Sequence, residues 1–162
     1  MKKTLVLGIG NILLKDEGIG VLTVRALLEQ YTLPETVEAL DGGVMGLSLL
    51  PAIEDADNLI VIDAIKSDSP PGTIERIEWQ DVNKTPIRAT TAHQIGLNEL
   101  LTLAEFEGRP PHTVIIGVVP LDITPGSTPS QLIKARLPVL VDAVVKELEE
   151  TGYKLKKGVR HA

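Results

Sequence analysis

The chain contains no cysteine, and only 2% of its 162 residues are aromatic. Without cysteine, a disulfide framework and a thiolate metal site are both excluded, so any metal must bind carboxylate, imidazole or backbone oxygen ligands. With so few aromatic side chains, the core must be built from leucine, isoleucine, valine and alanine. The formal net charge is −6, and the sequence has no basic stripe. The composition therefore argues against a nucleic acid partner, because little is available to stack on bases or to neutralise phosphates.

Long apolar runs are also missing, and no segment approaches the length of a membrane span. The start, Met1-Lys2-Lys3 followed by apolar residues, has some features of a signal peptide. However, Asn11 interrupts the apolar region, and Lys15-Asp16-Glu17 follows it without a small-residue cleavage site. We therefore expect a cytoplasmic protein without a membrane span.

Short apolar runs alternate with segments of helical periodicity along the chain, in which 43% of residues are hydrophobic. The runs predict strands over Leu5–Gly8, Val37–Leu40, Asn58–Ile62 and Thr113–Val119, with a less buried edge strand over Thr73–Trp79. The periodic segments predict helices over Val21–Gln30, Gly46–Ile53, Ile95–Ala104 and Ser130–Glu150. Two long loops are expected over Lys66–Gly72 and Asp81–Thr91.

Two helix details also follow from the sequence. Thr90 or Thr91 is a natural cap for the helix that follows, and Pro138 predicts a kink or a break inside the last helix. Alternation of strands and helices is typical of an α/β fold, in which helices cover both faces of a mostly parallel sheet. No repeat or low-complexity linker is present, so we expect a single domain over residues 1–152. Residues 153–162 form a basic tail that we expect to be mobile.

The stretch Leu5–Val21 joins a buried strand to a glycine-containing loop and then to a helix. This order is found in dinucleotide-binding folds, but the fingerprint GxGxxG requires glycine at position 13, where Leu13 stands. A P-loop is excluded because no Gly-Lys-Ser/Thr follows. Carboxylates beside a bound phosphate would also repel it. We therefore expect no nucleotide cofactor.

Acidic and imidazole side chains follow the predicted strands or precede a helix. Glu17 follows the first strand, Asp63 follows Asn58–Ile62, and His93 lies before the third helix. Because strand ends and helix starts meet at one edge of a parallel sheet, these three side chains can surround one point. Two carboxylates and one imidazole suit a divalent ion such as zinc, nickel or manganese, and three ligands leave coordination positions open.

Each of these residues also has a purely structural interpretation. Glu17 can stabilise a helix N-terminus by roughly 0.3–1 kcal/mol, and Asp63 can cap a turn. A histidine near a helix start is often structural, although the helix dipole there favours the neutral imidazole. Asp16 and Asp41 fit turn or cap positions. His112 and His161 are expected in solvent, and the sequence offers no GxSxG serine or cysteine nucleophile.

Taken together, the motifs resemble those of the nickel-iron hydrogenase maturation endopeptidases. The matching stretches run in family order from Leu7 to Pro120: LGIGNILLKDEGIGV, LDGGVMGLSLL, VIDAI with PPG downstream, HQIGLNELLTLA and IIGVVP. GNILLxDEGxGV together with HQxGLxxLL is a specific combination. The final helix and the tail match only in character.

The resemblance implies a three-layer α/β/α sandwich around a mostly parallel, twisted sheet of about five strands. It implies that Glu17, Asp63 and His93 contact the metal and that Asp41 lies near the site. It also implies an activity, the removal of a C-terminal extension from the large-subunit precursor of a [NiFe] hydrogenase. The nickel then arrives with the precursor, and we expect the enzyme to be a monomer.

Several points stay open at this stage. Nickel can serve for recognition or for catalysis, and Glu17, Asp63 or Asp41 can act as the general base of an acid-residue peptidase. The alternative to an enzyme is a non-catalytic module that senses nickel or escorts the precursor. A nucleotide-binding protein of doubly wound type is a further rival.

Overall fold

The computed structural model describes residues 2–43, 46–84, 88–89 and 96–158. The strands are β1 (Thr4–Ile9), β2 (Tyr31–Thr32), β3 (Val37–Gly43), β4 (Asn58–Lys66), β5 (Ile74–Glu78), β6 (Arg88–Ala89), β7 (His112–Val118) and β8 (Lys156–Lys157). The α-helices are α1 (Ile19–Gln30), α2 (Leu50–Asp55), α3 (Leu97–Phe106) and α4 (Gln131–Glu150). Three short 3-10 helices complete the described elements: η1 (Lys15–Gly18), η2 (Gly46–Leu49) and η3 (Trp79–Lys84).

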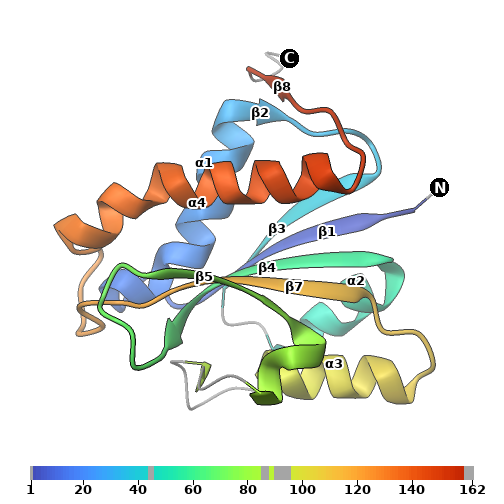
Figure 1. Cartoon of the computed structure of the whole chain (residues 1–162), viewed down its shortest axis with the longest axis horizontal. Helices are drawn as coiled ribbons and strands as arrows, with labels where there is room; N and C mark the ends of the chain where they lie inside the picture. The colour runs from blue at the N-terminus through green and yellow to red at the C-terminus, as the bar shows by residue number, and fades with distance from the viewer. Residues whose placement is uncertain (1, 44–45, 85–87, 90–95, 159–162) are drawn as a thin grey trace.

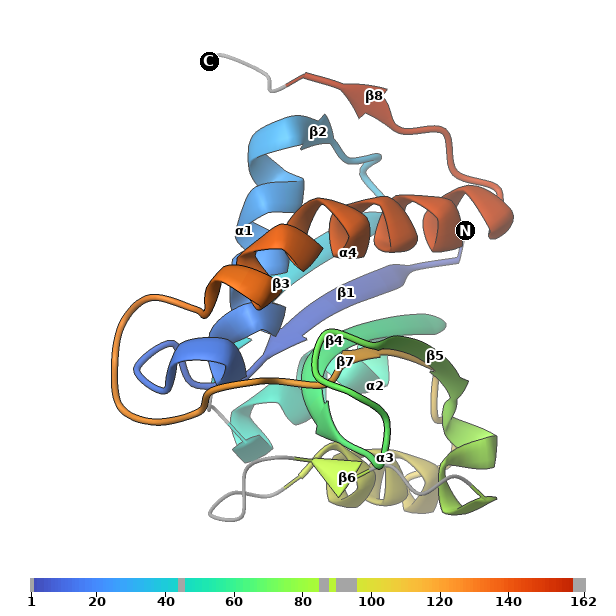
Figure 2. The ribbon, with the colours of Figure 1, turned by 60° about the vertical axis from the view of Figure 1, so that its left-hand side comes forward.

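The main sheet has the strand order β3-β1-β4-β7-β5, and β6 pairs with the end of β4. β3, β1, β4 and β7 are parallel to one another, whereas β5 runs antiparallel to β7 at one edge. Helices α1 and α4 cover one face of the sheet, and α2 and α3 lie on the other (Figures 1 and 2). This is the α/β/α sandwich with a mostly parallel sheet that the sequence predicts.

The strands are buried because apolar side chains point to both faces of the sheet. Alternate residues of β4 belong to two separate clusters: Ile60 and Ile62 face α1 and α4, and Leu59 and Val61 face α2 and α3. A strand that is covered on both faces has a continuous apolar sequence. This pattern allowed β1, β4 and β7 to be predicted as buried strands. Within the described ranges, no helix combines the length and the apolar character that crossing a bilayer requires.

The chain changes direction between β1 and β4. From β1 it passes through α1 to β3 on one side, and then through α2 to β4 on the other side of β1. The connection that leaves the carboxyl end of β1 thus leads to β3, whereas the chain that leaves the carboxyl end of β4 goes on to β5 and β7 on the opposite side. In open α/β sheets this switch point is where ligands bind.

Helix α1 starts directly against the ends of these two strands. A Cβ atom added at Gly20 would collide with the carbonyl oxygens of Ile9 and Ile62. Glycine at this position therefore lets the first turn of the helix lie on the sheet edge, close to the switch point.

Several local predictions were wrong. β4 continues to Lys66, so Asp63 lies within the strand rather than after it. The expected loop at 81–91 contains the end of η3 and the short strand β6. Helix α3 begins at Leu97 with Gly96 at its N-cap, and the two threonines proposed as caps, at 90 and 91, lie outside the described residues. The helix expected over 46–53 is divided into η2 and α2.

Helix α4 begins close to the expected residue, and Ser130 is its N-cap: the Ser130 hydroxyl accepts a hydrogen bond from the Ile133 backbone N–H. The helix continues through Pro138, so the break that was one of the two expected outcomes does not occur, and the kink stays a prediction. The chain after α4 packs against the rest of the domain. Strand β8 pairs with β2, and the Tyr153 hydroxyl lies 3.1 Å from the hydroxyl of Thr4. The segment expected to form a mobile tail thus includes a paired strand.

The substitution Gly20→Ala tests the close approach of α1 to the sheet. In an ordinary helix this change stabilises by about 1 kcal/mol. Here we expect a loss of about 1–3 kcal/mol, because the new methyl group has no space beside two strand carbonyls. Urea unfolding measures the difference, and Glu29→Ala on the exposed side of α1 is the control. A stabilised Gly20→Ala variant would contradict the packing described.

Candidate active site

Glu17 lies in η1, immediately before α1, at the switch point. Only 2% of its surface is exposed. The loop from β1 reaches it through Gly10, whose φ of 135° favours glycine and whose Cα lies against the Glu17 carbonyl oxygen. Among the described residues, nothing hydrogen-bonds the buried Glu17 Oε1. A buried carboxylate oxygen without a partner is costly, so this atom is suited to binding a group that the protein itself does not supply.

Asp63 approaches the same place from β4, and 8% of it is exposed. It is one residue beyond Ile62, which pairs with Gly8 of β1, and it pairs with Gly117 of β7 on its other side. The backbone N–H of Ala64 donates a hydrogen bond to its carboxylate. The sheet register therefore places Asp63 beside the loop that carries Glu17.

The two acids affect each other electrostatically. Burial raises the pKa of Asp63 well above its ordinary value, and the nearby negative charge of Glu17 raises it further. Burial also raises the pKa of Glu17, while the positive charge of Lys66 opposes that shift. Two buried, mutually repelling carboxylates are stabilised by a proton or by a cation between them. Their arrangement is therefore appropriate for a divalent cation.

Asp41 lies on the other side of β1, at the end of β3. Its Oδ2 accepts hydrogen bonds from Arg25 Nε at 3.2 Å and from Arg25 Nη2 at 2.9 Å. The side chain of Asp41 is 39% exposed. Because β1 separates β3 from β4, Asp41 and Asp63 lie two strand spacings apart, roughly 10 Å. Asp41 thus stands near the acid pair but in a separate, more solvated position.

His93, the third predicted metal ligand, lies outside the described residues. Within the described part of the chain, no group of three or more histidine, cysteine, aspartate or glutamate side chains has the arrangement of a metal site. The structure thus brings two of the three predicted ligands together. His112, expected in solvent, is the exposed first residue of β7, and His161 lies outside the described residues.

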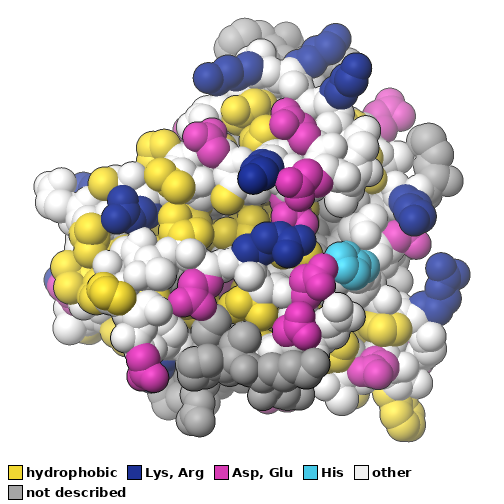
Figure 3. All heavy atoms as spheres, in the orientation of Figure 1, with side chains coloured by type: hydrophobic (Ala, Val, Ile, Leu, Met, Phe, Trp, Pro, Cys, Tyr) yellow, Lys and Arg dark blue, Asp and Glu magenta, His cyan; other side chains and the backbone are white. Residues whose placement is uncertain are grey.

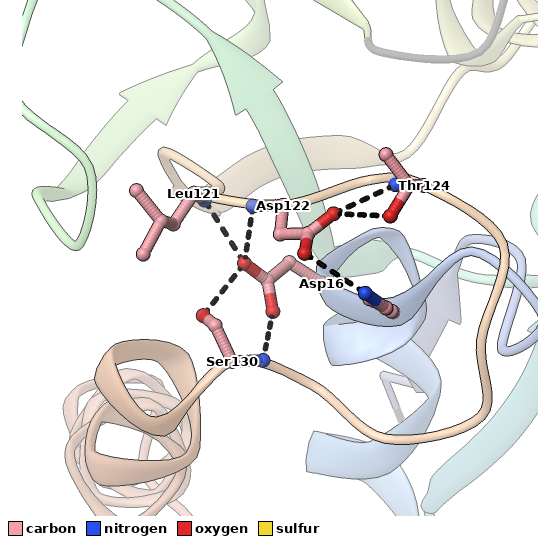
Figure 4. Close-up of polar contacts among 6 residues, drawn as sticks. Asp16, Leu121, Asp122, Thr124 and Ser130 are labelled. Carbon is pink, nitrogen blue, oxygen red and sulfur yellow. Dashed lines mark hydrogen bonds and ion pairs between the residues drawn. The ribbon is translucent and has the colours of Figure 1, made fainter.

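Asp16, next to Glu17, has a different role. It is fully buried, and its carboxylate accepts four hydrogen bonds from the loop between β7 and α4 (Figure 4). The donors are the backbone N–H groups of Leu121, Asp122 and Ser130, at 2.6–2.9 Å, and the Ser130 hydroxyl at 2.8 Å. Asp16 therefore ties the loop that carries Glu17 to the start of α4.

A second link joins the same two loops at the surface. Lys15 Nζ lies 2.9 Å from Asp122 Oδ2, and Thr124 donates two hydrogen bonds to the other oxygen of that carboxylate. The Thr124 bonds and the Lys15 contact lower the pKa of Asp122 to about 2. Lys15 adopts a positive φ of 49°. Lys15 and Asp16 therefore both fasten the segment that carries Glu17 to the loop between β7 and α4.

Comparison with known proteins decides the family. The family model described as hydrogenase maturation protease, HycI, matches residues 21–160. The chain belongs to the hydrogenase maturation protease family. This confirms the resemblance found in the sequence and the assignment to a peptidase family.

Individual members of the hydrogenase maturation protease family agree along nearly the whole chain. The hydrogenase 2 maturation protease of Escherichia coli K12 is 39% identical over 154 residues, which cover 93% of both chains. The hydrogenase expression/formation protein HupD of Rhizobium leguminosarum bv. viciae is 39% identical over 153 residues, 93% of this chain and 76% of the relative. The solved structure of the hydrogenase maturating endopeptidase HybD from E. coli superimposes with a TM-score of 0.89 at 35% identity, covering 96% and 97% of the two chains.

Sequence reasoning missed two charged residues around the site of this maturation protease. Arg25 faces Asp41 from the second half of α1, and Lys66 at the end of β4 acts on Glu17. Helical periodicity places Arg25 on the polar side of α1 but does not identify its partner on another element. The roles of Arg25 and Lys66 depend on contacts between distant segments, and a local sequence pattern cannot predict such contacts.

Asp63→Asn tests the burial of the acid pair. The pKa of Asp63 is higher in the folded than in the unfolded protein. The free energy of unfolding of wild type is therefore highest below the unfolded pKa of about 3.9, and it falls as the pH rises through the pKa of the folded state. Asparagine does not ionise, so the variant should be more stable than wild type at pH 8 by about 1–4 kcal/mol. The difference should vanish toward pH 3.5. Thermal unfolding measures it, with exposed Asp55→Asn as control; equal stability at every pH would contradict the assignment.

Asp16→Asn tests the link between the two loops. The amide keeps one acceptor oxygen but turns N–H groups toward backbone donors, so buried hydrogen bonds are lost. We expect a loss of about 2–4 kcal/mol and a lower Tm. Asp122→Asn, on the partner loop between β7 and α4 and more exposed, should lower the Tm less. The result that would argue against this role is an Asp16→Asn variant with the Tm of wild type.

Proposed function

We propose that this chain removes the C-terminal extension from the nickel-loaded large-subunit precursor of a [NiFe] hydrogenase. The observation that carries this proposal is the acid pair at the switch point, Glu17 with Asp63, in which the buried Glu17 Oε1 has no hydrogen-bond partner among the described residues. Membership of the hydrogenase maturation protease family and the names of its relatives support the reaction class.

In this proposal the nickel belongs to the substrate. Glu17, Asp63 and His93 provide two carboxylates and an imidazole, a donor set that accepts borderline divalent ions, with positions left for ligands from the precursor. Binding of the ion replaces the protons that the raised pKa values of the acid pair favour. Recognition of the nickel then fixes the precursor relative to the sheet edge.

Asp41 is the carboxylate that we assign to water activation. It is accessible to solvent, and its ion pair with Arg25 holds one oxygen in a fixed direction. A general base must lie within reach of a water molecule and of the bond that is cut, and a half-exposed acid beside a metal-recognition site meets the first condition. Glu17 and Asp63 remain rival bases if the nickel is not bound there. A cytoplasmic location and a monomeric state stay predictions.

The decisive experiment incubates the protein with nickel-loaded and nickel-free precursor and records the intact mass of the precursor. The proposal expects a shorter chain only from the nickel-loaded form. A non-catalytic escort or nickel sensor would bind the precursor without shortening it. Equal cleavage of both forms would refute the role of nickel, and no cleavage of either would refute the peptidase activity.

The variants Glu17→Gln and His93→Ala test the ligand set. Each removes one donor, so processing should fall at least about 100-fold. The thermal stability of Glu17→Gln should equal or exceed that of wild type, since burying a charge at this position is unfavourable. Asp55→Asn, an exposed acid paired with Lys3, is the matched control and should process normally. Normal processing by both site variants would show that the ligand set is wrong.

A further inference from the structure

A hollow of about 300 Å³ opens beside Asp41 at the carboxyl edge of the sheet. It is lined by Ile12 and Leu13 of the loop after β1, by Val21 and Arg25 of α1 and by Asp41 of β3. Its volume lies at the lower end of the range for small-molecule sites. The hollow is therefore better matched to one or two side chains of a larger partner than to a complete cofactor.

The apolar wall is exposed although its loop is held firmly. Ile12 is 37% exposed and Leu13 is 65% exposed. The Leu13 backbone N–H donates to Asn11 Oδ1 at 2.9 Å, and its carbonyl accepts a hydrogen bond from the Gly126 N–H at 2.9 Å. Exposed aliphatic side chains on a fixed loop are costly in water unless a partner covers them.

More exposed aliphatic side chains lie on the loop between β7 and α4, which is hydrogen-bonded to the loop of Ile12 and Leu13. Leu121 is 57% exposed and Ile123 is 37% exposed. Asp16 accepts hydrogen bonds from the backbone at 121 and 122, so the two loops are held side by side. Hydrophobic side chains gather at the left-hand end of the face in Figure 3, over the loop between β7 and α4.

The position of the hollow connects it to the acid pair. The backbone of Ile12 lies against Gly18, the residue after Glu17. Asp41 also lines the hollow, and its carboxylate is held there by Arg25, whose hydrocarbon stem adds apolar surface. β3 stands first in the strand order of the main sheet, so an extended segment can reach Asp41 from solvent without crossing another described strand.

We propose that this hollow is a subsite for a large aliphatic side chain of the precursor, next to the bond that is cut. The inference rests on the proposed function, which it deepens by naming the chemistry that the enzyme recognises beyond the metal. The apolar wall takes the side chain, while Arg25 and Asp41 limit the depth to which it enters. Binding there adds to the affinity for the precursor at a point next to the carboxylate of Asp41, and it contributes equally to the ground state and the transition state.

Steady-state cleavage of nickel-loaded precursor tests the subsite. Ile12→Ser and Leu13→Ser should each raise KM about 10-fold or more, because a hydrophobic subsite contributes through the apolar surface it buries. Their kcat should change by less than about twofold, since uniform binding affects KM alone. Leu13→Met keeps the apolar surface and should retain the wild-type KM. Leu28→Ser on α1 and Phe106→Ser on α3, 44% and 89% exposed, are matched controls away from the hollow.

A double-mutant cycle with the precursor identifies the side chain that enters. Each aliphatic residue near the cut is replaced by serine, and each altered precursor is tested with wild type and with Leu13→Ser. For the residue that enters the hollow, the two losses should be clearly less than additive. Full additivity at every position would overturn the proposal.

The outcomes separate this inference from the proposed function. Wild type that shortens the precursor, together with serine variants of unchanged KM, would refute the subsite and leave the peptidase activity intact. Wild type that never shortens the precursor would refute both. Circular dichroism and Tm show whether each variant is folded, and the exposure of both residues makes loss of the fold unexpected.

Discussion

The parallel pairing of β1 with β4 is the constraint on which the site depends. The register matches Gly8 with Ile62, so the loop after β1 and the next residue of β4, Asp63, emerge side by side. Because α1 starts directly against these strand ends at Gly20, the carboxylate of Glu17 is buried in the same place. The sheet thus forces two negative charges together in a poorly solvated position, which is unfavourable until a cation or proton joins them.

Adjacent residues in the chain show how differently a protein can treat a buried carboxylate. Asp16 accepts four hydrogen bonds, so its burial stabilises the connection between two loops. Glu17 has an oxygen that no described residue satisfies. Asp16 stabilises the structure. Because its hydrogen bonds fix this segment, Glu17 is held in a buried position that the fold does not itself stabilise. A buried polar atom without a partner requires an explanation, and a bound ion or a catalytic role is one of them.

Much of the fold could be predicted from the sequence because its signals are local. Continuous apolar runs identified β1, β4 and β7, and helical periodicity identified α1 and α4. The errors occur where contacts between distant segments decide the outcome. β4 continues past Ile62 since β7 pairs with it as far as Ala64, and β8 exists because β2 offers it an edge. Neither partner is visible in the local composition.

The sequence by itself determined the layer architecture, the family motifs and the two candidate acids, Glu17 and Asp63, because periodicity and residue type are properties of short segments. Only the tertiary structure decided that these two acids share one electrostatic environment, that Asp16 fastens two loops, and that Arg25 holds Asp41. The physical reason is that charge interactions, desolvation and hydrogen bonds depend on distance in space, and the chain fixes those distances only when the sheet forms.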